Sequence, residues 1–79
     1  MPSRKNPIEL YIVEVVKKKR KLLNINQDGI AKELGVTVGY IGQIESKKLK
    51  SMYSYEQLNE LAKFFKCSPK DFMPEQPID

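Results

Sequence analysis

The stretch from residue 36 to residue 45, VTVGYIGQIE, carries two conflicting patterns of hydrophobic positions. Its first half alternates between larger apolar and small residues and is rich in β-branched side chains, as a strand would be. Its second half places Ile41 and Ile44 three residues apart, and the stretch before it places Ile30 and Leu34 four apart, as a helix would. A strand would turn Ile41 and Ile44 to opposite faces and would leave Gly35 without a role.

Two helices joined at Gly35 account for all of these positions. Gly35 can adopt the left-handed conformation that ends a helix, and Val36 then places an apolar side chain in the corner. Ala31 is small where the two helices must approach closely. Gly39 and Gly42 each weaken the second helix by about 1 kcal/mol, so we expect that helix to depend on packing against its neighbours.

Five stretches of the chain open with residues that begin helices. In each, an asparagine, serine or threonine can accept a hydrogen bond from a backbone N–H of the first turn. In three of them, NPIE, SYEQ and SPKD, a proline, or a glutamate, glutamine or aspartate, follows at the favoured spacing. No Asn-Gly or Asp-Gly pair joins two alternating runs, as a hairpin would require. The sequence therefore predicts an all-α fold of five helices at residues 7–23, 27–34, 38–45, 55–65 and 69–73, capped by Asn6, Asn26, Thr37, Ser54 and Ser68.

The length of 79 residues suits one domain, with a core at about residues 7–73 and a flexible tail at residues 74–79. One cysteine, Cys67, and no histidine exclude an internal disulfide framework and remove the commonest zinc ligand and general base. We therefore expect no metal, no cofactor and no enzymatic activity. The apolar run IELYIVEVV contains two glutamates and is too short to span a membrane, so we expect a cytoplasmic protein without a membrane partner.

Charge is unevenly distributed along the chain. Residues 1–54 carry eleven lysines and arginines against five acidic residues, a net charge of +6, whereas residues 55–79 carry three against five, a net charge of −2. A basic larger part indicates a surface that faces an anion such as nucleic acid, the alternative being an ordinary solvated surface. The run KKKRK at residues 17–21 covers more than one helical turn and cannot face one ligand, so we assign it to the end of the first helix.

The segment NQDGIAKELGVTVGYIGQIESKK, residues 26–48, resembles the helix-turn-helix of the lambdoid phage repressor and Cro family, also called the XRE family. The resemblance extends from about Val16 to Met73 and includes LNELAKFFKCSPKDFM near the end of the chain. It implies a compact repressor-like fold that binds double-stranded DNA in a sequence-specific way. The helix at residues 38–45 would lie in the major groove, and the helix at residues 27–34 would cross the backbone.

The resemblance also implies which residues meet DNA. Gln27 is expected to donate to a phosphate, and Tyr40 and Gln43 to carry most of the polar contacts with bases. Val38 and Gly39 depart from the family pattern because neither side chain can donate a hydrogen bond, which leaves contact with a thymine methyl group and close backbone approach. The full set of expected DNA contacts is Asn26, Gln27, Thr37, Val38, Gly39, Tyr40, Gln43, Ser46 (through its backbone amide), Lys47 and Lys48.

Arg20 lies on the apolar stripe of the first helix, four residues after Val16 and three before Leu23. A charged side chain in that position needs a partner, and the resemblance suggests Glu45. The alternative is that Arg20 extends to solvent.

Two functions follow from this sequence. The first is a DNA-binding transcriptional regulator of the repressor type, or an antitoxin-like autoregulator with an unidentified protein partner, that binds DNA as a homodimer. The alternative is a protein-interaction module that keeps the fold but no longer reads DNA, which Val38 and Gly39 favour. Aromatic residues near the C-terminus are assigned to the core, although Phe72, Met73 and Ile78 can alternatively form a dimer surface.

Overall fold

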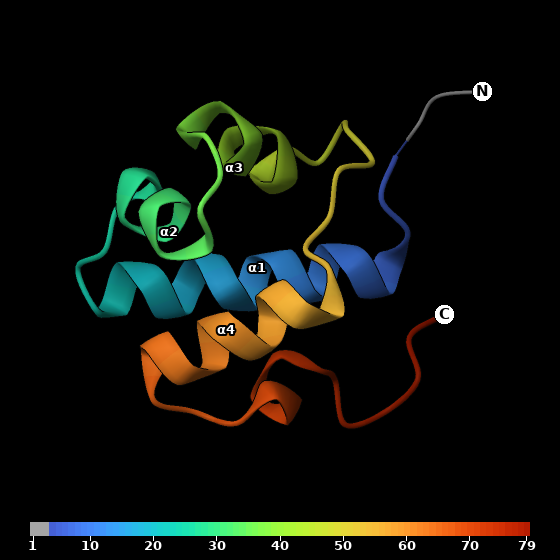
Figure 1. Cartoon of the computed structure of the whole chain (residues 1–79). Coiled ribbons are helices and arrows are strands. Elements are labelled where there is room, and N and C mark those ends of the chain that lie inside the picture. The colour runs from blue at the N-terminus through green and yellow to red at the C-terminus, as the bar shows by residue number, and fades with distance from the viewer. Residues whose placement is uncertain (1–3) are drawn as a thin grey trace.

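Four α-helices and one short 3₁₀ helix make up the fold in the computed structural model, which describes residues 4–79 (Figure 1). No strand occurs within these residues, so the predicted all-α fold class is confirmed. The elements are α1 (Pro7–Leu22), α2 (Gln27–Leu34), α3 (Val38–Glu45), α4 (Tyr55–Phe65) and η1 (Pro69–Phe72).

The starts of the four α-helices lie where the sequence predicts them. At each start, the side chain of the N-cap residue accepts a hydrogen bond from a backbone N–H of the first turn, and these residues are Asn6, Asn26, Thr37 and Ser54. The end of α1 at Leu22 comes one residue before the predicted end, and Asn24 then adopts a left-handed conformation with φ 61°. Local hydrogen bonds therefore define where these helices begin.

The prediction of a fifth α-helix over residues 69–73 is wrong, because the segment forms only the four-residue 3₁₀ helix η1. Ser68 begins it as expected, but the Asp71 N–H donates to the Ser68 carbonyl three residues back, rather than to one four residues back. Met73 is extended, with φ −100° and ψ 147°. It precedes Pro74, and a following proline disfavours the helical conformation, so the segment cannot continue as a helix.

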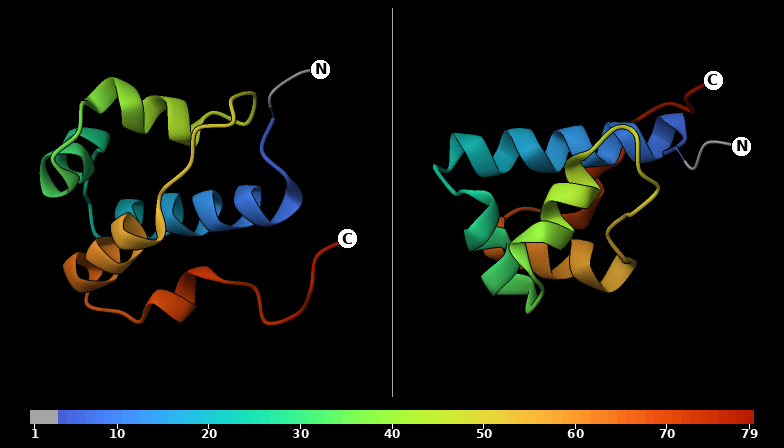
Figure 2. Two further views of the ribbon diagram at one scale, coloured as in Figure 1. Left: turned by 45° about the vertical axis from the view of Figure 1, so that its right-hand side comes forward. Right: turned by 90° about the horizontal axis from the view of Figure 1, so that it is seen from above.

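The helix α1 crosses the middle of the view in Figure 1, with α2 and α3 above it and α4 and η1 below, and the turned view on the left of Figure 2 keeps this order. α3 packs against α2 and α1, α2 also packs against α4, and η1 contacts both α1 and α4. None of the described helices is long and apolar enough to cross a membrane. Every element contributes to the core, whose fully buried side chains are Val16, Ile30, Ile41, Ile44, Leu61 and Phe72.

The aromatic residues near the C-terminus belong to the core, as the sequence predicts. Phe72 has no exposed surface, and its ring stands edge-on to that of Phe65 with 6.2 Å between the ring centroids. The alternative that Phe72 forms part of a dimer surface is therefore wrong. Met73 and Ile78 are exposed, and residues 74–79 contain no helix.

Candidate nucleic-acid interface

The corner between α2 and α3 is built by three consecutive residues. Gly35 ends α2 in the left-handed conformation, with φ 69° and ψ 34°, as the sequence predicts. A Cβ atom on Gly35 would meet nothing within 4 Å, so the requirement for glycine comes from the backbone angle and not from lack of space. Val36 packs partly buried against the core, and Thr37 begins α3 with its Oγ1 accepting from the Tyr40 N–H at 3.1 Å.

One face of α3 is buried and the other is open. Ile41 and Ile44 have no exposed surface, as expected for residues that hold α3 on the rest of the fold. Gly39 and Gln43 are four residues apart on the outer face, and both are exposed. Val38 is 48% exposed beside them. A Cβ on Gly39 would meet only the Thr37 Oγ1, at 4.0 Å, so no internal contact of this residue requires a glycine.

Tyr40 does not point outward with these residues. It is half-buried, packs against the core, and donates a hydrogen bond from its hydroxyl to the Met52 carbonyl at 3.4 Å. The reason is helical geometry, because Tyr40 is four residues before the buried Ile44 and shares its face. The hydroxyl expected to contact bases is therefore engaged within the protein.

Arg20 and Glu45 form the expected ion pair at the back of α3. The Arg20 Nε lies 2.8 Å from one carboxylate oxygen of Glu45, and its Nη2 lies 2.9 Å from the other. Their side chains are only 9% and 5% exposed. Arg20 also donates to the Ile25 carbonyl at 3.1 Å, so it joins α1, the turn before α2 and the end of α3.

Glu45 stays ionised despite its burial. Desolvation by burial raises the pKa of Glu45, but hydrogen bonds from Arg20 and Gln27 and the positive charge of Arg20 together outweigh it, so the net pKa lies below its usual value. The hydrogen bond with Glu45 raises the pKa of Arg20 against the opposing effect of burial. The pair therefore remains charged on both sides near neutral pH.

Gln27 has a partner that the sequence did not indicate. Its side-chain Nε2 donates to the same Glu45 oxygen that Arg20 Nη2 contacts, at 2.9 Å. This hydrogen bond engages one N–H of the group that the family resemblance assigns to a phosphate. Asn26, just before it, is exposed and uses its side-chain oxygen to accept from the Gly29 N–H at 2.8 Å. Glu45, the last residue of α3, is thus bonded to Gln27, the first residue of α2.

The segment after α3 is basic and exposed. Lys47, Lys48 and Lys50 all point into solvent, as expected for residues that contact phosphate. Ser46 differs from the expectation, because its backbone N–H donates to the Gln43 carbonyl at 3.2 Å and is used to finish the helix. The Ser46 hydroxyl in turn accepts from the Lys48 N–H at 3.3 Å.

Lys5 is the residue at this site that sequence reasoning missed. It precedes α1, yet it is only 5% exposed, and its ammonium group donates to the carbonyls of Ser46 and Leu49 at 2.6 Å each and of Gln43 at 3.5 Å. Burial lowers the pKa of Lys5, partly opposed by the negative charge of Glu9. Nothing in the spacing of the sequence distinguishes Lys5 from the neighbouring Arg4, which is exposed.

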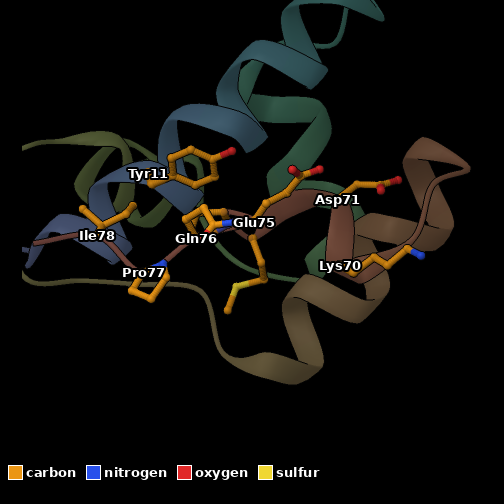
Figure 3. Close-up of a pocket in the computed structure, with 9 residues that line it drawn as sticks. Tyr11, Lys70, Asp71, Glu75, Gln76, Pro77 and Ile78 are labelled. Carbon is orange, nitrogen blue, oxygen red and sulfur yellow. The ribbon is translucent and has the colours of Figure 1, made fainter.

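A hollow between Tyr11 of α1 and the C-terminal residues 70–78 lies apart from this surface (Figure 3). No residue of α2, α3 or the following basic segment lines it. Among the described residues, no three histidine, cysteine, aspartate or glutamate side chains are grouped so that they could hold a metal ion. The exposed residues of α3 and the lysines after it therefore form the strongest candidate site.

Comparisons with known proteins identify the family of the fold. The model of the family HTH_3, described as helix-turn-helix, matches residues 16–72. An HTH_3 family transcriptional regulator from Vibrio cholerae is 26% identical, with a TM-score of 0.67 over 82% of this chain and 35% of that one. This chain therefore spans about a third of the length of that regulator. No curated protein matches the chain.

Two further solved structures share the fold at lower identity. The restriction-modification controller protein C.AhdI from Aeromonas hydrophila is 17% identical, with a TM-score of 0.69 over 82% of this chain and 96% of that one. Hydroxypropylphosphonic acid epoxidase from S. wedmorenis is 19% identical, with a TM-score of 0.73 over 87% of this chain and 36% of that one.

Proposed function

This chain belongs to the XRE-type helix-turn-helix family, and from that membership we propose that it is a transcriptional regulator that reads double-stranded DNA with α3. The observation that carries the proposal is the open outer face of α3. Gly39 and Gln43 lie exposed on it beside Val38, while Ile41 and Ile44 anchor the opposite face. A helix presented in this way fits the major groove of B-form DNA.

Base contacts in this proposal come from three exposed residues. The amide of Gln43 can pair with the N6 and N7 groups of adenine in a bidentate way. Val38 presents an apolar side chain that suits the methyl group of thymine. Gly39 lets the helix backbone approach the bases closely. Tyr40 supports the helix from behind, since its hydroxyl is bonded to Met52.

Phosphate contacts come from the two ends of this surface. Lys47 and Lys48 follow α3 and are exposed, and Asn26 and Gln27 lie at the start of α2, whose first backbone N–H groups favour an anion. These contacts position the protein and carry no sequence information by themselves. The net charge of +6 over residues 1–54 supports the same orientation toward DNA.

We propose that the protein binds as a homodimer and acts as a repressor or autoregulator, by occupying DNA and without catalysis. A single α3 of eight residues offers few base contacts, so one copy gives low affinity. Two copies would read half-sites about 10 base pairs apart. Footprinting of the saturated complex should show paired protected segments, and one isolated half-site would contradict the homodimer.

The second candidate is a protein-interaction module that keeps the fold and does not read DNA. It is favoured by the start of α3, where Val38 and Gly39 have no side-chain donor groups and the Tyr40 hydroxyl is engaged inside the protein. The fold likeness to a protein named as an epoxidase supports the general point that this fold occurs in proteins of different function.

A salt titration separates the two candidates. The affinity for random-sequence duplex DNA is measured between about 50 and 200 mM salt, and a regulator with 6–10 phosphate contacts should lose about 10³–10⁵ in affinity over that range. A selection from random DNA then identifies the preferred site. Weak binding with little salt dependence, and no enriched sequence, would contradict DNA reading and favour the protein-interaction module.

A further inference from the structure

The ammonium group of Lys5 lies at the C-terminal end of α3, although Lys5 precedes α1 in the chain. It donates to Ser46 and Leu49 carbonyls at 2.6 Å and to the Gln43 carbonyl at 3.5 Å, across 38 to 44 residues of sequence. In Figures 1 and 2 the segment before α1 rises beside the loop that follows α3. The contact therefore joins the first described residues of the chain to the end of the candidate DNA-reading helix.

Lys5 brings a positive donor to an end of α3 that has no basic residue of its own. The last carbonyls of a helix have no partner within the helix, and they are commonly satisfied by a glycine-based cap or by a basic residue in the last turn. α3 has neither, because its last turn contains no basic residue and Ser46 follows it in an extended conformation. The Gln43 carbonyl accepts from the Ser46 N–H at 3.2 Å, and Lys5 is its second donor. Lys5 also donates to the carbonyls of Ser46 and of Leu49 in the loop, so one positive group links the end of the helix to the segment after it.

We propose that Lys5 is a positioning residue for DNA binding, which fixes the loop at residues 46–50 and thereby the phosphate contacts of Lys47 and Lys48. This inference rests on the proposed DNA-binding function. Lys5 does not contact phosphate itself in this account, because it is 5% exposed and its three N–H groups have three carbonyl acceptors. Its effect on affinity acts through the loop.

The loop has few other restraints of its own. Lys47, Lys48 and Lys50 carry like charges within four residues, which repel one another and favour an open, mobile segment. The Lys48 N–H bonds the Ser46 hydroxyl at 3.3 Å, a weaker restraint than the two contacts of Lys5 at 2.6 Å. Without Lys5, we expect the loop lysines to spend most of their time away from the phosphates.

The experiment compares Lys5→Met with a matched control, Arg4→Met, which removes the same charge from the adjacent exposed position. Each is combined with Lys48→Ala, and the slope of log affinity against log salt is measured on random-sequence DNA. In the wild-type and Arg4→Met backgrounds, Lys48→Ala should make the slope shallower by about 1. In the Lys5→Met background it should change the slope by much less, because Lys48 has already lost its phosphate. A full change of about 1 in that background would overturn the proposal.

A second measurement needs no DNA. Amide hydrogen exchange of Ser46 and Lys48 in the free protein should be about tenfold or more faster in Lys5→Met and unchanged in Arg4→Met, while exchange in α4 stays the same. Unchanged exchange at Ser46 and Lys48 would overturn the role of Lys5. If Lys5→Met does not fold, Lys5→Gln, which keeps donors without the charge, is compared with the wild type and with Arg4→Met in the same way. It should still accelerate exchange of the same two amides, and unchanged exchange in Lys5→Gln would overturn the proposal.

These two readouts separate the inference from the proposed function. A wild-type protein that binds no DNA would refute DNA reading, and the exchange experiment would still decide whether Lys5 holds the loop. Steep salt-dependent binding by the wild type, with full additivity of Lys5→Met and Lys48→Ala, would keep the function and refute the positioning role.

Discussion

Glu45→Ala removes the acceptor on which three elements converge, and it should destabilise the protein strongly. Arg20 loses both of its carboxylate hydrogen bonds, at 2.8 and 2.9 Å, and Gln27 loses its hydrogen bond at 2.9 Å. The arginine side chain is 9% exposed, so most of its charge is left in a poorly solvated position without a partner. The cost comes chiefly from that unpaired buried charge.

The magnitude follows from this geometry. Breaking a buried pair by removing one partner costs about 3–5 kcal/mol. Arg20 keeps its hydrogen bond to the Ile25 carbonyl at 3.1 Å, which places the expected loss at the lower end, about 3 kcal/mol. A domain of 79 residues has a total stability of about 4–12 kcal/mol, so the variant should unfold at a clearly lower denaturant concentration.

Urea unfolding of a double-mutant cycle tests this reasoning. The cycle contains Arg20→Met, Glu45→Ala and the double variant, and the double variant should be more stable than the sum of the two losses predicts by about 2–3 kcal/mol. Glu60→Ala is the control, because Glu60 pairs with Lys63 at 3.3 Å on the surface, where their side chains are 44% and 68% exposed. Its loss should stay within about 0.5 kcal/mol.

The outcome that would refute the account is additivity. If the two losses sum to within about 0.5 kcal/mol, Arg20 and Glu45 do not stabilise each other in solution. A loss for Glu45→Ala no larger than that for Glu60→Ala would show that the site is solvated.

Three further predictions concern the corner and α3. Gly35→Val should lower the free energy of unfolding by more than about 1 kcal/mol because of the positive φ, and Gly35→Asn by less, since asparagine tolerates that conformation. If Gly35→Val melts at the same temperature as the parent, the turn is wrong. Gly39→Ala should raise stability by about 0.4–1 kcal/mol, because its Cβ would meet only the Thr37 Oγ1, at 4.0 Å. It should weaken DNA binding if the helix backbone approaches the bases, and a loss of thermal stability would show that the site does not accept a methyl group. Because folding lowers the pKa of Glu45, its contribution to stability is present above its unfolded pKa of about 4.3 and is lost as the pH falls through its folded pKa. In urea unfolding between pH 7 and 3, acid should therefore reduce the stability of the parent more than that of Glu45→Gln. Parallel curves of stability against pH would argue against the lowered pKa.

The parts of the fold that were predictable from the sequence depend on interactions between near neighbours. The cap of α3 at Thr37 and the positive φ at Gly35 are each decided within four residues, and both are observed. The half-buried position of Tyr40 can also be predicted, because it lies four residues before Ile44. The family resemblance and the polar hydroxyl of tyrosine pointed instead to a contact with DNA bases. The short 3₁₀ form of η1 could have been predicted as well, because Pro74 disfavours a helical conformation at Met73.

The parts that were not predictable depend on partners far apart in the chain. Lys5 meets carbonyls 38 to 44 residues away, and backbone carbonyls carry no sequence signal. The Gln27 hydrogen bond to Glu45 spans 18 residues, and its acceptor is the carboxylate oxygen that also accepts from Arg20 Nη2. Sequence resemblance located the Arg20 and Glu45 pair, whereas only the packed structure shows that Glu45 serves Gln27 too.

The central claim is that α3 reads base sequence, and Gln43→Ala compared with Lys48→Ala tests it most directly. Both variants are measured on the preferred site obtained by selection and on random duplex DNA, at two salt concentrations. Gln43→Ala should cost about 1–3 kcal/mol on the preferred site and little on random DNA. Lys48→Ala should weaken both DNAs to a similar degree and make the salt slope shallower by about 1. If Gln43→Ala weakens random DNA as much as the preferred site, α3 does not read sequence through Gln43, and the claim fails.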